Sequence, residues 1–101
     1  MNERQFHFEW DEIKAAANLD KHGVSFELAS TVFHDPRLFT AADLEHGETE
    51  ERWFSIGFAS NGSMLSIAYL WSESDAATTK IRLISAREAT KMEIRHYRES
   101  L

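Results

Sequence analysis

The sequence of 101 residues contains no cysteine, and this absence excludes disulfide bonds and thiolate metal sites. It has no apolar run that approaches the roughly 18 residues a membrane-spanning helix needs. Its first residues, MNERQFHFEWDE, lack the apolar segment of a signal peptide. A chain without cysteine also suits a reducing compartment. We therefore expect a soluble protein of the cytoplasm with no membrane contact.

Positive charge is scarce as well. The chain has 11 Lys and Arg against 17 Asp and Glu, so its formal net charge is −6. Such a protein is a poor candidate for broad, non-specific binding of nucleic acid. The cations are nevertheless concentrated near the C-terminus, which suits either a solvated helix face or a local site for a polyanion. They are Lys80, Arg82, Arg87, Lys91, Arg95 and Arg98.

Hydrophobic residues make up 43% of the chain, which is enough for a core at this length. We expect one domain over residues 1–101. Phe6, Phe8 and Trp10 alternate with polar residues, as in a half-buried strand. Asp11 can then cap a helix that ends at Gly23.

A second helix begins after Ser25 and is stopped by Asp35 and Pro36. Strands are expected near residues 37–40, 53–58, 64–70 and 80–85, with a tight turn at Asn61-Gly62. Thr90 and Glu93 form a capping box for a last helix, although residues 85–88 fit one too. This order predicts an α+β fold: a small antiparallel sheet with helices packed on one face.

Three stretches of the sequence carry a family resemblance: FEWDEIKAAANLDKHGVSFELASTVFHDP, ERWFSIGFASNG and IRLISAREATKMEIRHY. Together they resemble the BrnT toxins, the ribonuclease half of a bacterial type II toxin–antitoxin pair. The resemblance implies a RelE-like fold, RNA cleavage without metal or cofactor, and a BrnA-like antitoxin. That antitoxin would form a hetero-oligomer with the toxin and would carry the contact with operator DNA.

One strand departs from this resemblance. Family members often have a threonine and an arginine at the end of the strand written here AYLWSES. This chain has Leu70, Trp71, Ser72 and Glu73 instead, and Glu73 would repel a phosphate that the arginine attracts.

RNA cleavage without metal needs a base, an acid and positive charge for the phosphorane. We expect His22, Arg82 and Arg87 to be catalytic, because histidine titrates near neutrality and a guanidinium can hold a phosphate bidentately. The alternatives are that His22 only caps a helix and that Arg82 pairs with the acidic residues between Asp43 and Glu51. We further expect Lys21, Arg52 and Trp71 to contact RNA and Glu50 or Glu51 to be a base. The alternatives are solvated charge for Lys21 and the two glutamates, and pairing of Arg52 with Glu50 and Glu51.

The histidines do not suggest a metal site, because no pair has the spacing that zinc ligands usually show. The central expectation is that Lys21, His22, Arg82 and Arg87 gather in one pocket. Two rival functions remain open: a catalytically silent binding module that acts through its antitoxin, and an unrelated metal-dependent hydrolase.

Overall fold

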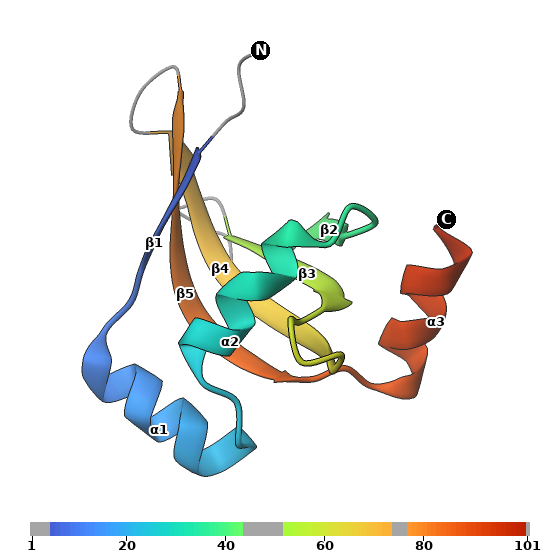
Figure 1. Cartoon of the computed structure of the whole chain (residues 1–101), viewed down its shortest axis with the longest axis horizontal. Helices are drawn as coiled ribbons and strands as arrows, with labels where there is room; N and C mark the ends of the chain where they lie inside the picture. The colour runs from blue at the N-terminus through green and yellow to red at the C-terminus, as the bar shows by residue number, and fades with distance from the viewer. Residues whose placement is uncertain (1–4, 44–51, 74–76, 101) are drawn as a thin grey trace.

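The computed structural model describes residues 5–43, 52–73 and 77–100, so the expected bases Glu50 and Glu51 lie outside the described residues. Figure 1 shows a curved central sheet with the helices arranged around it. Along the chain the elements are β1 (Gln5–Glu9), α1 (Glu12–His22), α2 (Phe26–Ser30), the 3-10 helix η1 (Thr31–His34), β2 (Phe39–Ala42), β3 (Arg52–Phe58), β4 (Met64–Glu73), β5 (Thr78–Glu88) and α3 (Lys91–Glu99).

The helix ends form as the sequence predicts. The carboxylate of Asp11 accepts hydrogen bonds from the backbone N–H groups of Ile13 and Lys14 at the start of α1. Gly23 ends this helix with a φ of 70°, a left-handed conformation that glycine adopts without strain. The Ser25 hydroxyl caps α2. The KHGVSF stretch is therefore a helix junction.

The sheet has the order β1-β5-β4-β3-β2. β2, β3, β4 and β5 form antiparallel pairs, but β1 runs parallel to β5. The prediction of an antiparallel sheet is therefore wrong at this edge. A parallel neighbour needs a long crossover, and here everything from α1 to β4 lies between the two strands in sequence.

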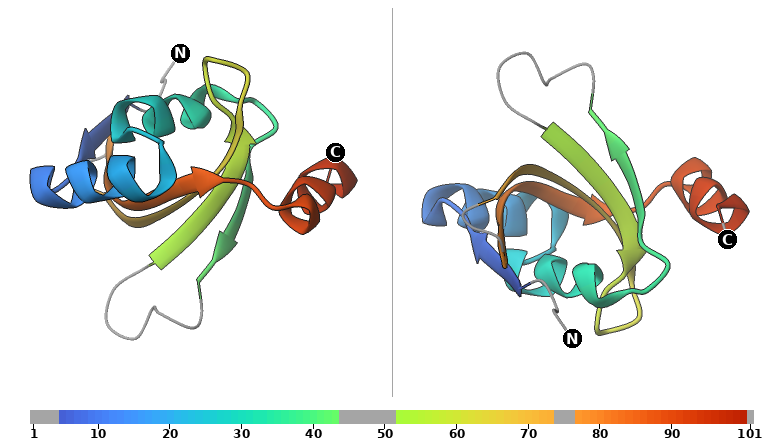
Figure 2. Two further views of the ribbon diagram at one scale, coloured as in Figure 1. Left: turned by 90° about the horizontal axis from the view of Figure 1, so that it is seen from below. Right: turned by 90° about the horizontal axis from the view of Figure 1, so that it is seen from above.

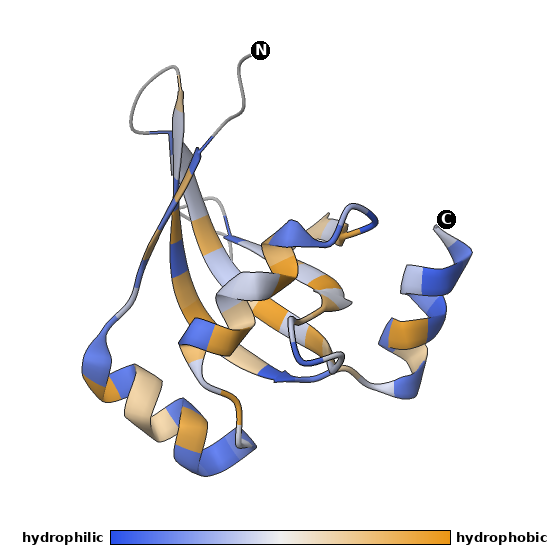
Figure 3. Ribbon diagram, in the orientation of Figure 1, coloured by the Kyte–Doolittle hydropathy of each residue, from blue (hydrophilic) through white to orange (hydrophobic). Residues whose placement is uncertain are grey.

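One face of the sheet, here called the core face, packs against α2 and η1. Leu65, Ile67 and Tyr69 of β4 point to it and are buried with Phe26 and Val32. Figure 3 shows the alternation of polar and apolar residues along β5 that this two-faced arrangement requires.

The other face of the sheet is partly covered by α3 and is called the α3 face. Ser66, which alternates with Leu65 and Ile67, donates its hydroxyl to Glu93 of α3 at 3.3 Å. In Figure 2 α1 and α3 lie at opposite ends of the molecule, with strands between them. The prediction that all helices pack on one face is therefore wrong, since β3, β4 and β5 are apolar enough to need cover on both sides.

β5 contains one extra residue. Leu83 pairs with Tyr69 and Ser85 pairs with Ala68, so Ile84 has no cross-strand partner. Such a β-bulge reverses the alternation of side chains beyond it. Arg82 and Arg87, five positions apart, would point to opposite faces of a regular strand, and the bulge brings both to the α3 face.

Asn18 connects α1 to the part of β5 that extends beyond β1. Its amide nitrogen donates to the carbonyls of Val24 and Ala86, each at 2.9 Å, and its oxygen accepts from the Ala86 N–H at 3.1 Å. The side chain is buried. It supplies the hydrogen bonds that a neighbouring strand would supply at this position.

We predict that Asn18→Leu lowers the free energy of unfolding by about 2–4 kcal/mol, because it leaves buried backbone groups of Ala86 and Val24 unpaired. Urea unfolding followed by circular dichroism measures this. Leu19→Ala is the control, since Leu19 is 50% exposed, and it should change stability much less. Equal stability of Asn18→Leu and the wild type would contradict the assigned role of Asn18.

Candidate functional site

Cross-strand register places several charged side chains in one row on the α3 face. Arg52 of β3 pairs with Leu70, Leu70 pairs with Arg82, and Arg82 pairs with Glu9 of β1. Neighbouring strands are about 4.8 Å apart, so the backbones of Arg52 and Arg82 are separated by about 10 Å. We call Arg52, Lys80, Arg82, Glu9 and His7 the charged row.

Within the charged row, the Glu9 carboxylate lies between two cations. Its Oε1 is 3.5 Å from Nη1 of Arg82, and its Oε2 is 4.0 Å from Nζ of Lys80. The side chains of Lys80 and Arg82 are 42% and 44% exposed, so these ion pairs contribute little to stability. An incoming phosphate can therefore exchange for them at low cost.

Arg52 has a carboxylate neighbour of its own. Its Nε is 3.2 Å from Oδ2 of Asp43, the last described residue before residue 52. The guanidinium has two further nitrogens that can donate hydrogen bonds. The predicted pairing of Arg52 with Glu50 or Glu51 lies outside the described residues.

Arg87 has a different environment, which we call the Glu93 cluster: Arg87, Glu93, Ser66 and Thr90. The guanidinium binds Glu93 bidentately at 2.7 and 2.9 Å. Glu93 also accepts from the Thr90 N–H at 2.8 Å, as its part in the capping box of α3. Arg87 therefore attaches α3 to the sheet, a structural contact that competes with the predicted catalytic role.

The Glu93 cluster perturbs both of its charged members. The hydrogen bond from Arg87 holds the pKa of Glu93 below its usual value, against an opposing effect of burial. The same hydrogen bond raises the pKa of Arg87. Both groups are therefore charged near neutral pH.

Lys21 and His22 end α1, which lies at the opposite end of the molecule from α3 (Figure 2). Lys21 is exposed and His22 is half-buried. The two arginines share the α3 face, and α1, which Lys21 and His22 end, is held to β5 beside Arg87 through Asn18 and Ala86. That Lys21 and His22 join them in one pocket stays a prediction.

Trp71 is explained by packing. It pairs with Ile81 on the core face, and its ring meets that of Phe6 edge-on with centroids 6.4 Å apart. Its side chain therefore lies on the opposite face of the sheet from the arginines, and its RNA contact stays a prediction. Glu73 pairs with the buried Thr79 and so also points away from the charged row, whereas Leu70 and Ser72 point toward it.

His7, Glu9 and Lys80 are members of the charged row that sequence reasoning missed. The alternation of His7 and Glu9 with Phe6 and Phe8 was visible in the sequence. The parallel pairing that opposes His7 to Lys80 and Glu9 to Arg82 was not, because it joins positions more than 70 residues apart.

Two absences apply to the described ranges alone. Residues 5–43, 52–73 and 77–100 contain no group of three or more His, Asp or Glu side chains that could hold a metal ion. Within the same ranges, no helix is both long and apolar enough to cross a membrane.

Comparison with known proteins identifies the family. The sequence model described as "Ribonuclease toxin, BrnT, of type II toxin-antitoxin system" matches residues 10–93. The chain belongs to the BrnT family. This confirms the resemblance inferred from the three sequence stretches, and the type II family implies an antitoxin partner.

The fold is similar to that of a solved BrnT structure. The 1.1 Å crystal structure of the Brucella abortus ribonuclease toxin BrnT matches with a TM-score of 0.62 and 19% sequence identity. The match covers 86% of this chain and 99% of that chain. It confirms the α+β fold of a BrnT protein. No curated protein sequence matches this chain.

We predict that Glu93→Gln, which retains a capping oxygen, lowers the free energy of unfolding by about 1–2 kcal/mol at pH 7. Because the folded pKa of Glu93 is lowered, the difference from wild type is fully present above the unfolded pKa of about 4.3. It should disappear as pH falls through the lower folded value. Urea unfolding at several pH values measures this, with exposed Glu99→Gln as the control. A pH-independent difference would contradict the ion pair's contribution.

Proposed function

We propose that this chain is a metal-independent endoribonuclease toxin that binds RNA on its α3 face. The observation that carries the proposal is the charged row, in which Arg52, Lys80 and Arg82 share one face with the Glu9 carboxylate. Membership of a ribonuclease toxin family supports the same reading. A RelE-like relationship of the fold and action in the cytoplasm belong to this proposal as well.

The reaction needs three groups around a phosphodiester. The RNA 2′-oxygen attacks phosphorus, the bond from phosphorus to the 5′-oxygen breaks, and a 2′,3′-cyclic phosphate and a 5′-hydroxyl result. In this proposal Arg82 and Lys80 hold the phosphate and stabilise the charge of the phosphorane. Arg52 contacts a neighbouring phosphate.

Proton transfer is assigned to the two other members of the charged row. Glu9, between the two cations, accepts the proton of the 2′-hydroxyl. His7, exposed on the same face and opposite Lys80, donates a proton to the leaving 5′-oxygen. Glu50 and Glu51 remain alternative bases outside the described residues. His22 and Lys21, at the C-terminal end of α1, remain the alternative catalytic group and RNA contact that the sequence predicts.

The partner in this proposal is a BrnA-like antitoxin that forms a hetero-oligomer with the toxin. A chain of net charge −6 is poorly suited to hold operator DNA, so the antitoxin supplies that contact. No cofactor takes part in the proposed reaction.

A specific observation favours a second candidate, a catalytically silent BrnT-like module that acts through its antitoxin in transcription. Arg52, Arg82 and Arg87 each already have a carboxylate partner within the chain. Leu70, Trp71, Ser72 and Glu73 also stand where BrnT relatives often carry threonine and arginine, and of these Leu70 and Ser72 point toward the charged row. This candidate predicts tight co-purification with the antitoxin and intact RNA.

We predict that the purified toxin cleaves labelled RNA in excess chelator and that Arg82→Ala lowers kcat/KM by about 10²–10³-fold. Lys14→Ala, which removes a cation from α1, is the matched control and should cleave like the wild type. Intact RNA with the wild type would support the silent module, and cleavage that chelator abolishes would favour a metal-dependent hydrolase.

Glu9→Gln separates chemistry from binding. It should lower kcat by about 10²–10⁴-fold, since the base is lost. Affinity for RNA should stay equal or rise, because a negative charge leaves the phosphate-binding face. Single-turnover cleavage and fluorescence anisotropy measure the two effects, and weaker binding by Glu9→Gln would contradict its assignment as the base.

A further inference from the structure

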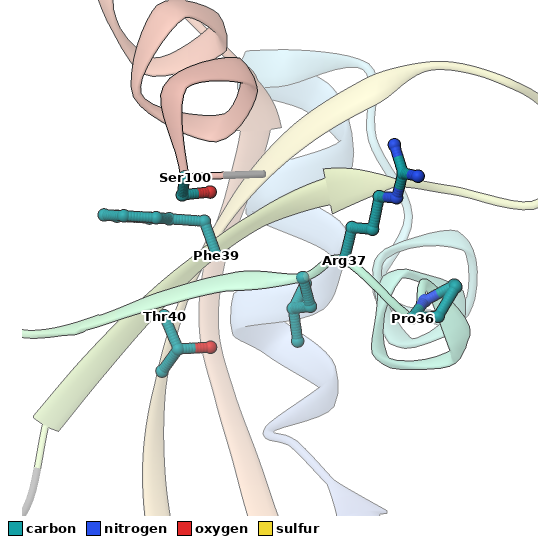
Figure 4. A pocket seen from close by; sticks show the side chains of 6 residues that line it. Pro36, Arg37, Phe39, Thr40 and Ser100 are labelled. Carbon is teal, nitrogen blue, oxygen red and sulfur yellow. The ribbon is translucent and has the colours of Figure 1, made fainter.

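A pocket of about 460 Å³ lies between the start of β2 and the C-terminal end of α3. Figure 4 shows it from close by, with Phe39, Ser100 and Arg37 around it. We call it the Phe39 pocket. Its volume is in the range of small-molecule and nucleotide sites. The lining residues are Pro36, Arg37, Leu38, Phe39, Thr40 and Ser100.

Alternation along this segment decides which side chains are available to a ligand. Thr40 bonds the Ser55 hydroxyl at 2.9 Å, and Leu38 lies over Gly57, where a Cβ would approach its Cδ1 to 2.7 Å. The side chains of Thr40 and Leu38 therefore contact the sheet. Arg37 and Phe39 extend to the other side, and Arg37 is exposed (Figure 4).

Asp35 fixes the geometry of this segment. Its Oδ1 accepts from the Arg37 N–H at 2.9 Å, and its Oδ2 accepts from the Phe58 N–H at 2.9 Å and the Tyr97 hydroxyl at 2.8 Å. The segment, β3 and α3 are therefore held together before any ligand binds. The carboxylate is also satisfied by these donors, so it competes weakly for the Arg37 guanidinium.

Phe39, the aromatic residue of the pocket lining, and two rings next to it suit a nucleobase. The Phe39 ring is nearly parallel to the His96 ring, at 25° with centroids 6.2 Å apart, and a second ring, Phe54, lies 6.4 Å away. Aromatic rings beside a cation are the usual binding elements for single-stranded nucleic acid. The Ser100 oxygen, which donates to the Tyr97 carbonyl, retains lone pairs for a base amino group.

The Phe39 pocket is continuous with the charged row. Phe39 pairs with Ile56, and Phe54 and Arg52 follow on the same side of β3. An RNA strand can therefore pass from Arg37 over Phe39 and Phe54 to Arg52 and Arg82 without leaving the α3 face.

We propose that the Phe39 pocket binds one base of single-stranded RNA away from the scissile phosphate, with Arg37 on an adjoining phosphate. This inference rests on the proposed ribonuclease function and adds a substrate subsite to it. It assigns Phe39 to base stacking and therefore to the choice of cleavage position.

The test measures binding of a fully 2′-O-methylated, fluorescent single-stranded RNA, which lacks the nucleophile and cannot be cut. Phe39→Leu should weaken binding by about 5- to 100-fold, the usual effect of one lost stacking contact. Phe39→Trp should restore it. Phe6→Leu, at a 39% exposed ring on the core face, is the matched control and should bind like the wild type.

Arg37→Ala should weaken binding and reduce the slope of log affinity against log salt by about 0.7, the value for one phosphate of a single strand. Lys14→Ala removes the same charge on α1 and should leave the slope unchanged. Thermal unfolding by circular dichroism shows that each variant is folded.

Cleavage assays separate this inference from the proposed function. If Phe39→Leu cuts RNA with wild-type KM and cut sites, the subsite is wrong and the ribonuclease proposal stands. If the wild type binds the methylated RNA through Phe39 but cuts no RNA, the subsite stands and the cleavage proposal fails. If Phe39→Leu loses only antitoxin binding, the pocket is a protein contact and the proposal is overturned.

Discussion

The unpaired Ile84 in β5 is the constraint on which the arrangement of the α3 face depends. A strand presents alternate residues to opposite sides, so one inserted residue changes the side of everything beyond it. Before the bulge Arg82 points to the α3 face, and after it Arg87 does so again. Without the insertion, Arg87 would point into the core and Ala86 would leave it, and α3 would lose its ionic attachment.

The two arginines on either side of the bulge have different roles for physical reasons. Arg87 is bound bidentately to a Glu93 that is itself held by Thr90 and Ser66, so replacing this partner costs several hydrogen bonds. Arg82 has one longer contact to Glu9. A phosphate can therefore compete for Arg82 far more easily than for Arg87. Arg87 thus attaches α3 to the sheet, whereas Arg82 remains available to a phosphate.

Local chemistry was predictable from the sequence, and long-range pairing was not. The caps at Asp11, Ser25 and Thr90 and the left-handed Gly23 follow from residues a few positions apart. The Asn61-Gly62 turn likewise appears between β3 and β4, with the Asn61 side chain accepting from Ser63.

The residues that define the charged row come from β1, β3 and β5, and their proximity depends on the parallel β1–β5 pair, while the bulge sets the side of Arg87. Neither feature leaves a short-range signal. The capping box at Ser85–Glu88 fits the pattern equally well but lies in β5, where strand pairing overrides it. The packing of Trp71 against Phe6 was likewise not visible in the sequence, because the two residues are 65 positions apart.

Gly57 lines no part of the Phe39 pocket, yet it contacts the segment that forms the pocket. A methyl group at position 57 would come within 2.7 Å of the Leu38 Cδ1 and 3.2 Å of an Asp35 oxygen. Alanine here would require the Leu38 side chain to turn aside and the Asp35 carboxylate to give by a few tenths of an ångström. Glycine at position 57 thus leaves room under the sheet edge for the carboxylate that bonds both β3 and the segment leading to Phe39.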